Sequence, residues 1–182
     1  NEIAESYLPS SRSLINVDVK SYAVFAAEKA IELLNIDSPT GHTKDAANWV
    51  LKEFEKFGFK TSLTNKGAVL IDFGGKDSDQ GALLFEAHTD TLGAVIAQIK
   101  GNGRLRISNV GGLNASNVET ENVKIYSREG KSFEGTIQLV NASVHVNRNA
   151  GSEERTFDSV EVVLDENVSS AEDVKKLGLD VG

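Results

Sequence analysis

The hydrophobic pattern of this chain changes abruptly near Gly93, and this change constrains the fold more than any other feature. Residues 19–34 and 44–57 carry apolar side chains at the spacing of one helix face. From residue 95 to residue 146 the chain instead consists of short β-like runs separated by turn residues. Strand and helix patterns then return near the C-terminus. This order predicts an α/β protein with a small antiparallel barrel or sandwich inserted into another domain.

Capping and turn residues support the elements that precede Gly93. Asp18 can cap the first helix, Thr43 can cap the second, and Gly58 suits the position that follows a helix end. Residues 59–64 and 68–73 are separated by an Asn-Lys-Gly turn, which predicts a β-hairpin.

We expect the chain to divide into four parts. Residues 1–17 are polar and aperiodic, and we expect a mobile arm or an edge segment there. Residues 18–93 form the first part of an α/β domain, residues 94–158 the inserted β-rich domain, and residues 159–182 the truncated return to the first domain.

Composition excludes several classes of partner. The chain has 19 Lys and Arg against 27 Asp and Glu, a net charge of −8, so we expect neither a nucleic-acid nor an anionic-membrane surface. No run approaches the roughly 18 apolar residues of a spanning helix, and the first residues do not have the layout of a signal peptide. The predicted location is therefore cytoplasmic. With no cysteine, disulfides and thiolate metal sites are excluded.

An apolar run over residues 82–87 ends in His88, and Asp90 follows two residues later. If that run is a buried strand, both side chains lie at its carboxyl end, where ligands of open α/β sheets gather. In metal sites one ring nitrogen of a histidine binds the ion while a carboxylate orients the ring. His88 is therefore a candidate metal ligand and Asp90 its candidate partner. The alternative is a structural histidine at a strand end.

Short motifs along most of the chain, taken together in their order and spacing, resemble the M42 family of metal-dependent aminopeptidases, which includes glutamyl aminopeptidases and tetrahedral peptidases. The motifs are Asp37-Ser38-Pro39-Thr40-Gly41, Ala87-His88-Thr89-Asp90-Thr91-Leu92-Gly93, Gly103-Arg104-Leu105-Arg106, Gly111-Gly112, Gly135-Thr136-Ile137, Ser143-Val144-His145, Leu164-Asp165-Glu166, Ser170-Ala171-Glu172-Asp173 and Leu177-Gly178-Leu179-Asp180-Val181-Gly182.

The resemblance implies an αβα metallopeptidase-like catalytic domain, incomplete here, with a β-rich domain inserted after the His-x-Asp segment. It implies two divalent ions, zinc or cobalt, with His88 as a ligand of one. Asp90 is then the catalytic-site carboxylate that fixes the tautomer of His88. It also implies peptide substrates and a homo-oligomer formed through the inserted domain.

The sequence departs from the family pattern at its end. In the family, the segment matching residues 177–182 is followed by an aspartate that bridges both ions, whereas this chain stops at Gly182. We therefore expect the bridging ligand, the general base and the other ligands to lie further on. As the amino-terminal part of an aminopeptidase, the 182 residues alone are expected to be inactive and to bind no metal tightly.

Two other functions stay open. One is a related metallohydrolase acting on another amide, such as a deacylase. Members of the family have also been labelled endoglucanases, but no second catalytic carboxylate is associated here with sugar-binding aromatic residues. The other is a non-catalytic assembly or binding module whose contacts come from the β-rich insert.

Overall fold

A computed structural model describes residues 18–75, 81 and 83–182, so the arm expected over residues 1–17 lies outside the described part. The chain separates into two compact units, Asn1–Ile36 and Asp37–Gly182, and each is described here by itself. Among the described residues, no helix is long and apolar enough to cross a membrane.

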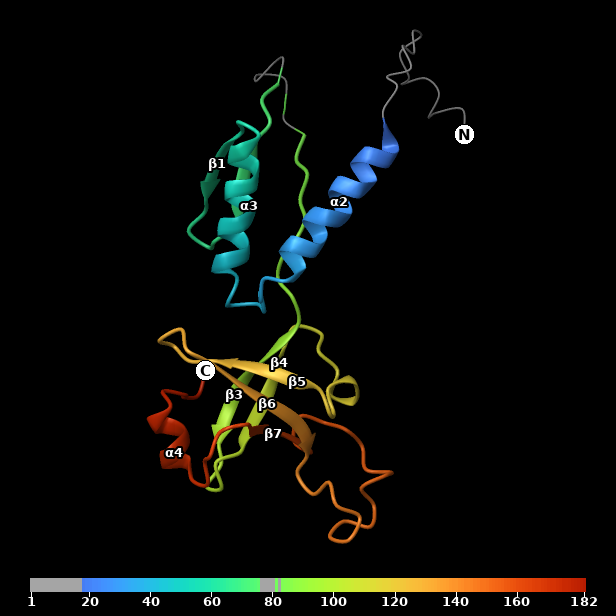
Figure 1. Ribbon diagram of the computed structural model, residues 1–182, viewed down its shortest axis with the longest axis vertical. Coiled ribbons are helices and arrows are strands. Elements are labelled where there is room, and N and C mark those ends of the chain that lie inside the picture. Colours follow the sequence, from blue (N-terminus) through green and yellow to red (C-terminus); the bar gives the residue numbers. More distant parts are fainter. Residues whose placement is uncertain (1–17, 76–80, 82) are drawn as a thin grey trace. The chain divides into compact units, whose positions relative to one another are not determined.

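The described part of the first unit is helix α2, Val19–Leu34 (Figure 1). Its bounds match the predicted helix. The Asp18 side chain accepts a hydrogen bond from the Ser21 N–H at 3.2 Å, which confirms Asp18 as the N-cap.

The second unit begins with helix α3, Lys44–Lys56, and its hairpin of β1, Lys60–Leu63, and β2, Val69–Asp72. The two strands are antiparallel, and the predicted hairpin is confirmed. Gly58 has a φ of +82°, the left-handed conformation expected just after a helix end. Thr43 occupies the N-cap position of α3 as expected, but its side chain makes no capping hydrogen bond.

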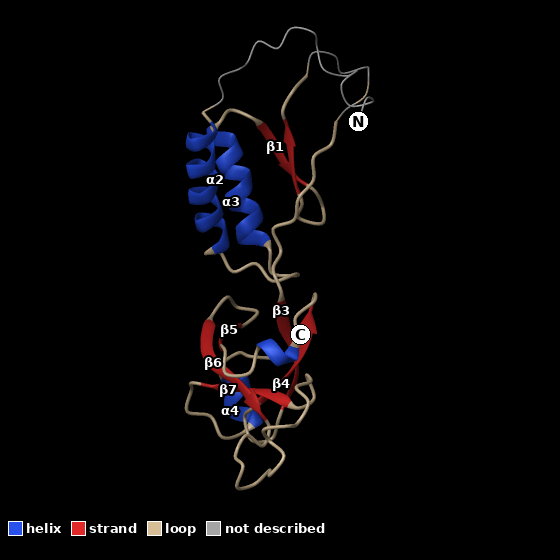
Figure 2. Ribbon diagram, turned by 90° about the vertical axis from the view of Figure 1, so that its right-hand side faces the viewer, coloured by secondary structure: helices blue, strands red, loops and turns tan. Residues whose placement is uncertain are grey.

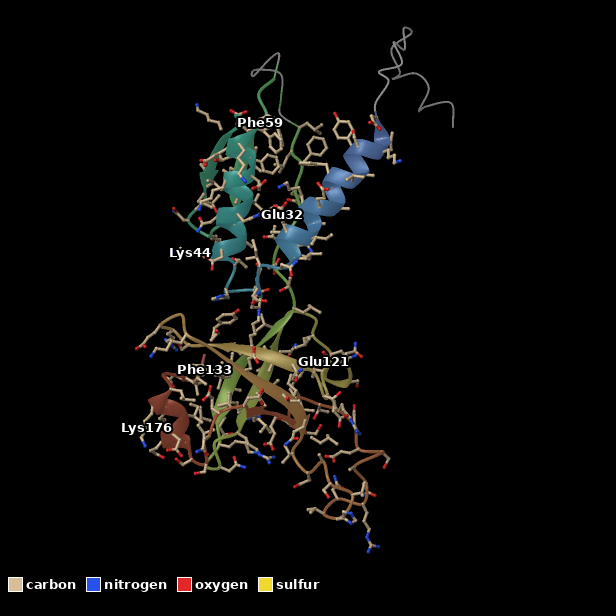
Figure 3. The ribbon with its side chains drawn as sticks, in the orientation of Figure 1. Glu32, Lys44, Phe59, Glu121, Phe133 and Lys176 are labelled. Carbon is tan, nitrogen blue, oxygen red and sulfur yellow. The ribbon has the colours of Figure 1, made fainter. Side chains whose placement is uncertain are left out.

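Aromatic packing joins α3 to the hairpin. The rings of Phe54, Phe59 and Phe73 lie edge to face or tilted, with centroids 5.0–6.1 Å apart (Phe59 is labelled in Figure 3). Aromatic pairs prefer these geometries, and each adds about 0.5–1.5 kcal/mol beyond the burial of its area. The small residues Ala46 and Ala47 are buried on the same helix.

The strand expected over residues 82–87 is wrong for its described part. Residues 83–87 form no strand, and the side chains of Leu83, Leu84 and Phe85 are 76–81% exposed. A strand forms only where a neighbouring strand pairs with its backbone. Among the described residues, β1 and β2 pair only with each other, so this segment has no strand partner.

Beyond Gly93 the chain forms one five-stranded antiparallel sheet, which makes this a mixed α/β structure (Figure 2). The spatial order of the strands is β3-β4-β7-β6-β5, and a short 3₁₀ helix, η1, precedes β5. The bounds of these elements are β3 Gly93–Ile99, β4 Leu105–Val110, η1 Ala115–Asn117, β5 Asn122–Tyr126, β6 Ser132–Leu139 and β7 Val160–Leu164.

The core of the sheet extends into the last helix, α4, Ala171–Lys176. Val174 of α4 and Leu179 beyond it are fully buried in the same cluster as Leu105 and Leu139. β7 lies between β4 and β6, so the sheet includes residues that we assigned to the returning part of the first domain. The division into a first domain and an insert stays a prediction.

The sheet also buries a charge. Glu161 of β7 is 1% exposed, and its carboxylate accepts hydrogen bonds from Lys100 Nζ at 2.6 Å and from the Arg104 guanidinium. A buried carboxylate is tolerated only when it is paired in this way. These two bonds tie the β3–β4 turn to the central strand and engage both oxygens of Glu161.

Helix α4 starts with a capping arrangement close to the one expected from Ser170-Ala171-Glu172-Asp173. The Ser170 Oγ accepts from the Asp173 N–H at 3.2 Å, and its hydroxyl donates to Asp173 Oδ2 at 2.7 Å. The Ser170 hydroxyl, followed by the Ser169 N–H, lowers the pKa of Asp173 from 3.8 to about 2. These bonds favour the ionised carboxylate.

This shift predicts a pH-dependent contribution to stability. Because the folded pKa of Asp173 lies below the unfolded value of about 3.9, the unfolded chain binds more protons between roughly pH 4 and pH 2. The contribution is complete above that window and is lost as the pH falls through the folded pKa. Asp173→Asn should therefore lower the urea midpoint at pH 7, and its difference from the wild type should shrink from pH 4 to pH 2 and be lost only below pH 2.

Glu172→Gln is the matched control, since it removes a charge from the same first turn but leaves the Ser170–Asp173 bonds in place. It should show only the smaller effect of the helix dipole. A gap between Asp173→Asn and the wild type that stays constant from pH 5 to pH 2 would contradict this assignment.

Candidate active site around His88 and Asp90

The structure places the two predicted site residues in contact. His88 Nδ1 lies 3.1 Å from Asp90 Oδ1 and 3.1 Å from the Asp90 carbonyl oxygen. Both partners are acceptors, so Nδ1 carries the proton and donates it. The other ring nitrogen, Nε2, then presents a lone pair. The His88 side chain is 85% exposed, and that of Asp90 is 39% exposed.

Thr40 holds the second oxygen of Asp90, a contact that the sequence did not reveal. Its hydroxyl donates to Asp90 Oδ2 at 2.6 Å, across 50 residues of chain. This hydrogen bond, followed by the one from His88, holds the pKa of Asp90 below its ordinary value. Asp90 is therefore an ionised acceptor at neutral pH. The only sequence signal for Thr40 was its place in the motif at residues 37–41.

Backbone hydrogen bonds bring these two segments together. The Thr91 N–H donates to the Ser38 carbonyl at 2.7 Å, and the Thr40 N–H donates to the Thr91 carbonyl at 3.3 Å. These bonds form an isolated parallel bridge between Pro39 and Thr91. The Asp90 position is thus fixed by the loop at residues 38–40, and not by a strand that ends at His88.

A glycine permits this close approach. A Cβ atom built on Gly93 would lie 2.6 Å from Pro39 Cβ, well inside van der Waals contact. Any larger residue would push the loop away from Thr91. The collision of a Cβ with Pro39 therefore explains why the His-x-Asp motif ends in glycine.

The beginning of the same loop is held by β5. The Asp37 carboxylate accepts hydrogen bonds from Lys124 Nζ at 2.8 Å and from the Tyr126 hydroxyl. These two bonds, that of Lys124 first, lower the pKa of Asp37. The ring of His42, a few residues further along the loop, stacks on Tyr126 with centroids 4.7 Å apart. Asp37 is thus engaged in a structural contact.

This arrangement supplies one candidate metal ligand, the Nε2 atom of His88. Nε2 of His88 is exposed and oriented as a metal-binding imidazole is, with a carboxylate behind its other nitrogen. Within residues 18–75, 81 and 83–182, no three His, Asp or Glu side chains gather closely enough to hold an ion. His88 and Asp90 fit the roles of one ligand and its orienting carboxylate within a larger metal site.

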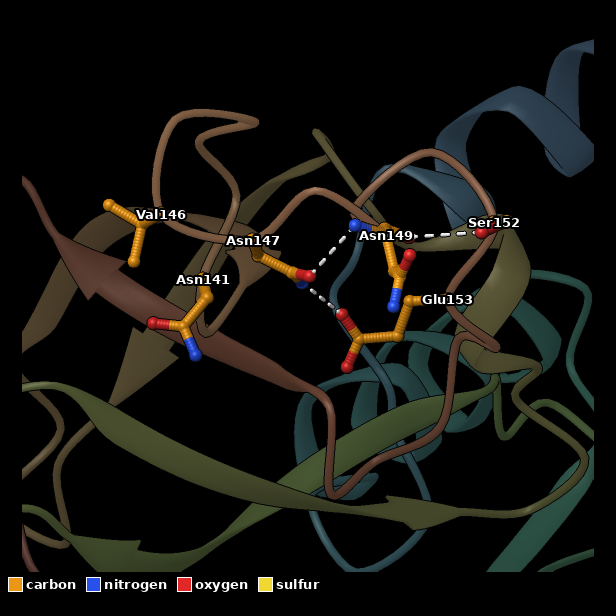
Figure 4. A pocket seen from close by; sticks show the side chains of 6 residues that line it. All are labelled: Asn141, Val146, Asn147, Asn149, Ser152 and Glu153. Atoms are coloured by element: carbon orange, nitrogen blue, oxygen red, sulfur yellow. Dashed lines mark hydrogen bonds between the residues drawn. The ribbon is translucent and has the colours of Figure 1, made fainter.

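A separate hollow lies in the loop between β6 and β7 (Figure 4). Its polar groups bond to one another: Asn147 Nδ2 donates to Glu153 Oε2 at 2.6 Å, and the Ser152 hydroxyl donates to the Asn149 carbonyl at 3.3 Å. Asn147, Ser152 and Glu153 therefore hold the loop in shape through these bonds.

The Gly93–Pro39 contact generates a stability prediction. Gly93→Ala should displace the loop at residues 38–40 and destabilise the fold by about 1–3 kcal/mol, the usual cost of overpacking. Urea unfolding measures this effect. Gly112→Ala is the control, because a Cβ there meets nothing within 4 Å. Equal unfolding midpoints for the two variants would show that the close approach is not maintained.

Comparison with known proteins places the chain in a family. The profile of the M42 glutamyl aminopeptidase family matches residues 67–182. The curated protein named "Putative aminopeptidase YhfE" of Bacillus subtilis strain 168 is 37% identical over 151 residues, covering 83% of this chain and 43% of that protein. The chain therefore spans less than half the length of this relative.

Solved structures share the fold. Aminopeptidase APDkam598 from the archaeon Desulfurococcus kamchatkensis superposes with a TM-score of 0.72 at 24% identity, covering 83% of this chain and 39% of that one. The Pyrococcus horikoshii TET1 peptidase, described as assembling into a tetrahedron or a large octahedral shell, gives 0.68 at 21% identity, covering 85% and 44%. With the family profile matching more than half of its residues, the chain belongs to the M42 glutamyl aminopeptidase family.

Proposed function

We propose that the protein containing this chain is a metal-dependent aminopeptidase that removes N-terminal residues from peptides. The observation that carries the proposal is the His88–Asp90 pair, in which Nδ1 is held by a carboxylate and Nε2 is free. Membership of the M42 family supports the same activity. In this proposal the described residues are the first part of an αβα catalytic domain and its β-rich insert.

Each residue of the pair has a distinct role in this proposal. His88 Nε2 holds one of two divalent ions, zinc or cobalt, and Asp90 keeps the ring in the tautomer that leaves Nε2 unprotonated. Divalent ions of this kind lower the pKa of a bound water and polarise the scissile carbonyl. Asp90 is ionised at neutral pH, which also favours a donating Nδ1–H.

The 182 residues alone are inactive in this proposal. Zinc sites use three or four protein ligands, and the described residues gather no such group. The additional ligands and the general base then come from other parts of the protein.

The protein is further proposed to form a homo-oligomer through its β-rich residues. Val144 and Val146, in the loop between β6 and β7, are 61% and 76% exposed, and this pair of apolar side chains is available for a contact with another copy. The assemblies described for the TET1 peptidase support this proposal by likeness of fold.

Substitution of the pair tests the function. In the complete protein, Asp90→Ala should lower metal affinity and kcat/KM by about 10–100-fold, the usual effect of losing a carboxylate behind a ligating histidine. His88→Ala should cost at least as much, because it removes a ligand. Titration with cobalt and hydrolysis of amino-acid p-nitroanilides measure both. Lys52→Ala, which replaces an exposed side chain of α3, is the control and should match the wild type.

The substrates separate the proposal from its alternatives. An aminopeptidase cleaves peptides with a free amine and no longer cleaves the same peptides once they are N-acylated. Cleavage of only the acylated forms would instead identify a deacylase. An intact oligomer that cleaves neither form with zinc or cobalt would identify a binding or assembly module.

A further inference from the structure

The carboxylate of Asp90 is shared between two donors from distant parts of the chain. His88 Nδ1–H occupies Oδ1 at 3.1 Å, and the Thr40 hydroxyl occupies Oδ2 at 2.6 Å. An ionised carboxylate can only accept, so the direction of both bonds is fixed. The Thr40–Asp90 distance is that of a strong bond between a hydroxyl and a charged oxygen.

We infer that Thr40 is a positioning residue of the active site, which fixes the Asp90 carboxylate and, through it, the tautomer of His88. The inference rests on the proposed function, in which Nε2 of His88 is a metal ligand. Thr40 touches neither substrate nor metal in this role. It acts only on the group that orients the ligand.

Thr40 is well suited to this task because its hydroxyl has little freedom. A β-branched side chain is stiff at χ1, so the hydroxyl direction follows the backbone. That backbone is fixed on both sides by the bonds between the loop and Thr91, at 2.7 Å and 3.3 Å. The hydroxyl is therefore held in place before any ligand arrives, and little entropy is lost in using it.

Without the Thr40 hydroxyl, no side chain of the described structure donates to Asp90 Oδ2. A carboxylate of an Asp side chain rotates easily about χ2, since that torsion is broad. The His88 ring is 85% exposed, and its only described hydrogen-bond partner outside the Asp90 side chain is the Asp90 carbonyl. Rotation of the carboxylate then weakens its hold on the ring, and the tautomer protonated on Nε2, which has no lone pair at that nitrogen for a metal, becomes populated.

The test is the tautomer of His88 in the complete protein without metal. Histidine labelled with ¹⁵N is observed by magic-angle-spinning NMR at a pH where the ring is neutral, and His88 is assigned by the signal lost in His88→Asn. The wild type should show the Nδ1–H form. Thr40→Val, which keeps the shape and loses the hydroxyl, should show a mixture of tautomers. Thr40→Ser, which keeps the hydroxyl, should restore the wild-type spectrum.

Cobalt affinity gives a second readout that does not depend on turnover. Thr40→Val should weaken cobalt binding by about 10-fold, the low end of the range for groups behind a metal ligand. Thr40→Ser should recover most of it. Thr136→Val is the matched control, because it removes an equivalent hydroxyl bond, to Asn122 at 3.1 Å, within the sheet. It should change neither the tautomer nor the cobalt affinity.

Three outcomes would overturn the inference: an unchanged Nδ1–H tautomer in Thr40→Val, the same loss in Thr40→Ser as in Thr40→Val, or the same loss in Thr136→Val. If Thr40→Val does not fold, a Thr40→Ser protein with a mixed tautomer also contradicts it. Failure of the proposed function looks different. In that case the wild-type protein binds no cobalt and cleaves no peptide, while the tautomer measurements still decide the role of Thr40.

Discussion

The bridge between Ser38, Thr40 and Thr91 is the contact on which the rest of the site depends. Two backbone hydrogen bonds join a loop that precedes α3 to the residue that follows Asp90. The segment before His88 has no strand partner in the described structure, so it cannot fix the direction of the site by itself. The loop does so instead, and Gly93 makes the approach sterically possible.

The parts of this structure that are determined locally were predictable from the sequence. The helix over residues 19–34, its Asp18 cap and the hairpin with its Gly67 turn depend on side chains only a few residues apart. The order of the sheet did not follow from such patterns. β7 lies between β4 and β6 because of pairings such as Gly135 with Leu164, which no periodicity encodes.

Separation along the sequence also explains which contacts of the candidate site could be predicted. His88 and Asp90 are two residues apart, so their contact could be predicted from the motif alone. Thr40 lies 50 residues from Asp90, and nothing in its own neighbourhood indicates that its hydroxyl reaches a carboxylate. Residues 83–87 of the strand expected over 82–87 form no strand for a related reason, since an apolar run shows a tendency to pair but cannot show whether a partner is present.

The sheet supports the site through both of its outer strands. β3 begins at Gly93, directly after the His-x-Asp segment, and β5 holds Asp37 at the start of the loop through Lys124 and Tyr126. These are the first and last strands in the spatial order of the sheet. The contacts that hold the sheet together therefore also help to set the distance between the loop and Asp90. In the proposed function, the five-stranded sheet is therefore also part of the frame that holds the candidate site.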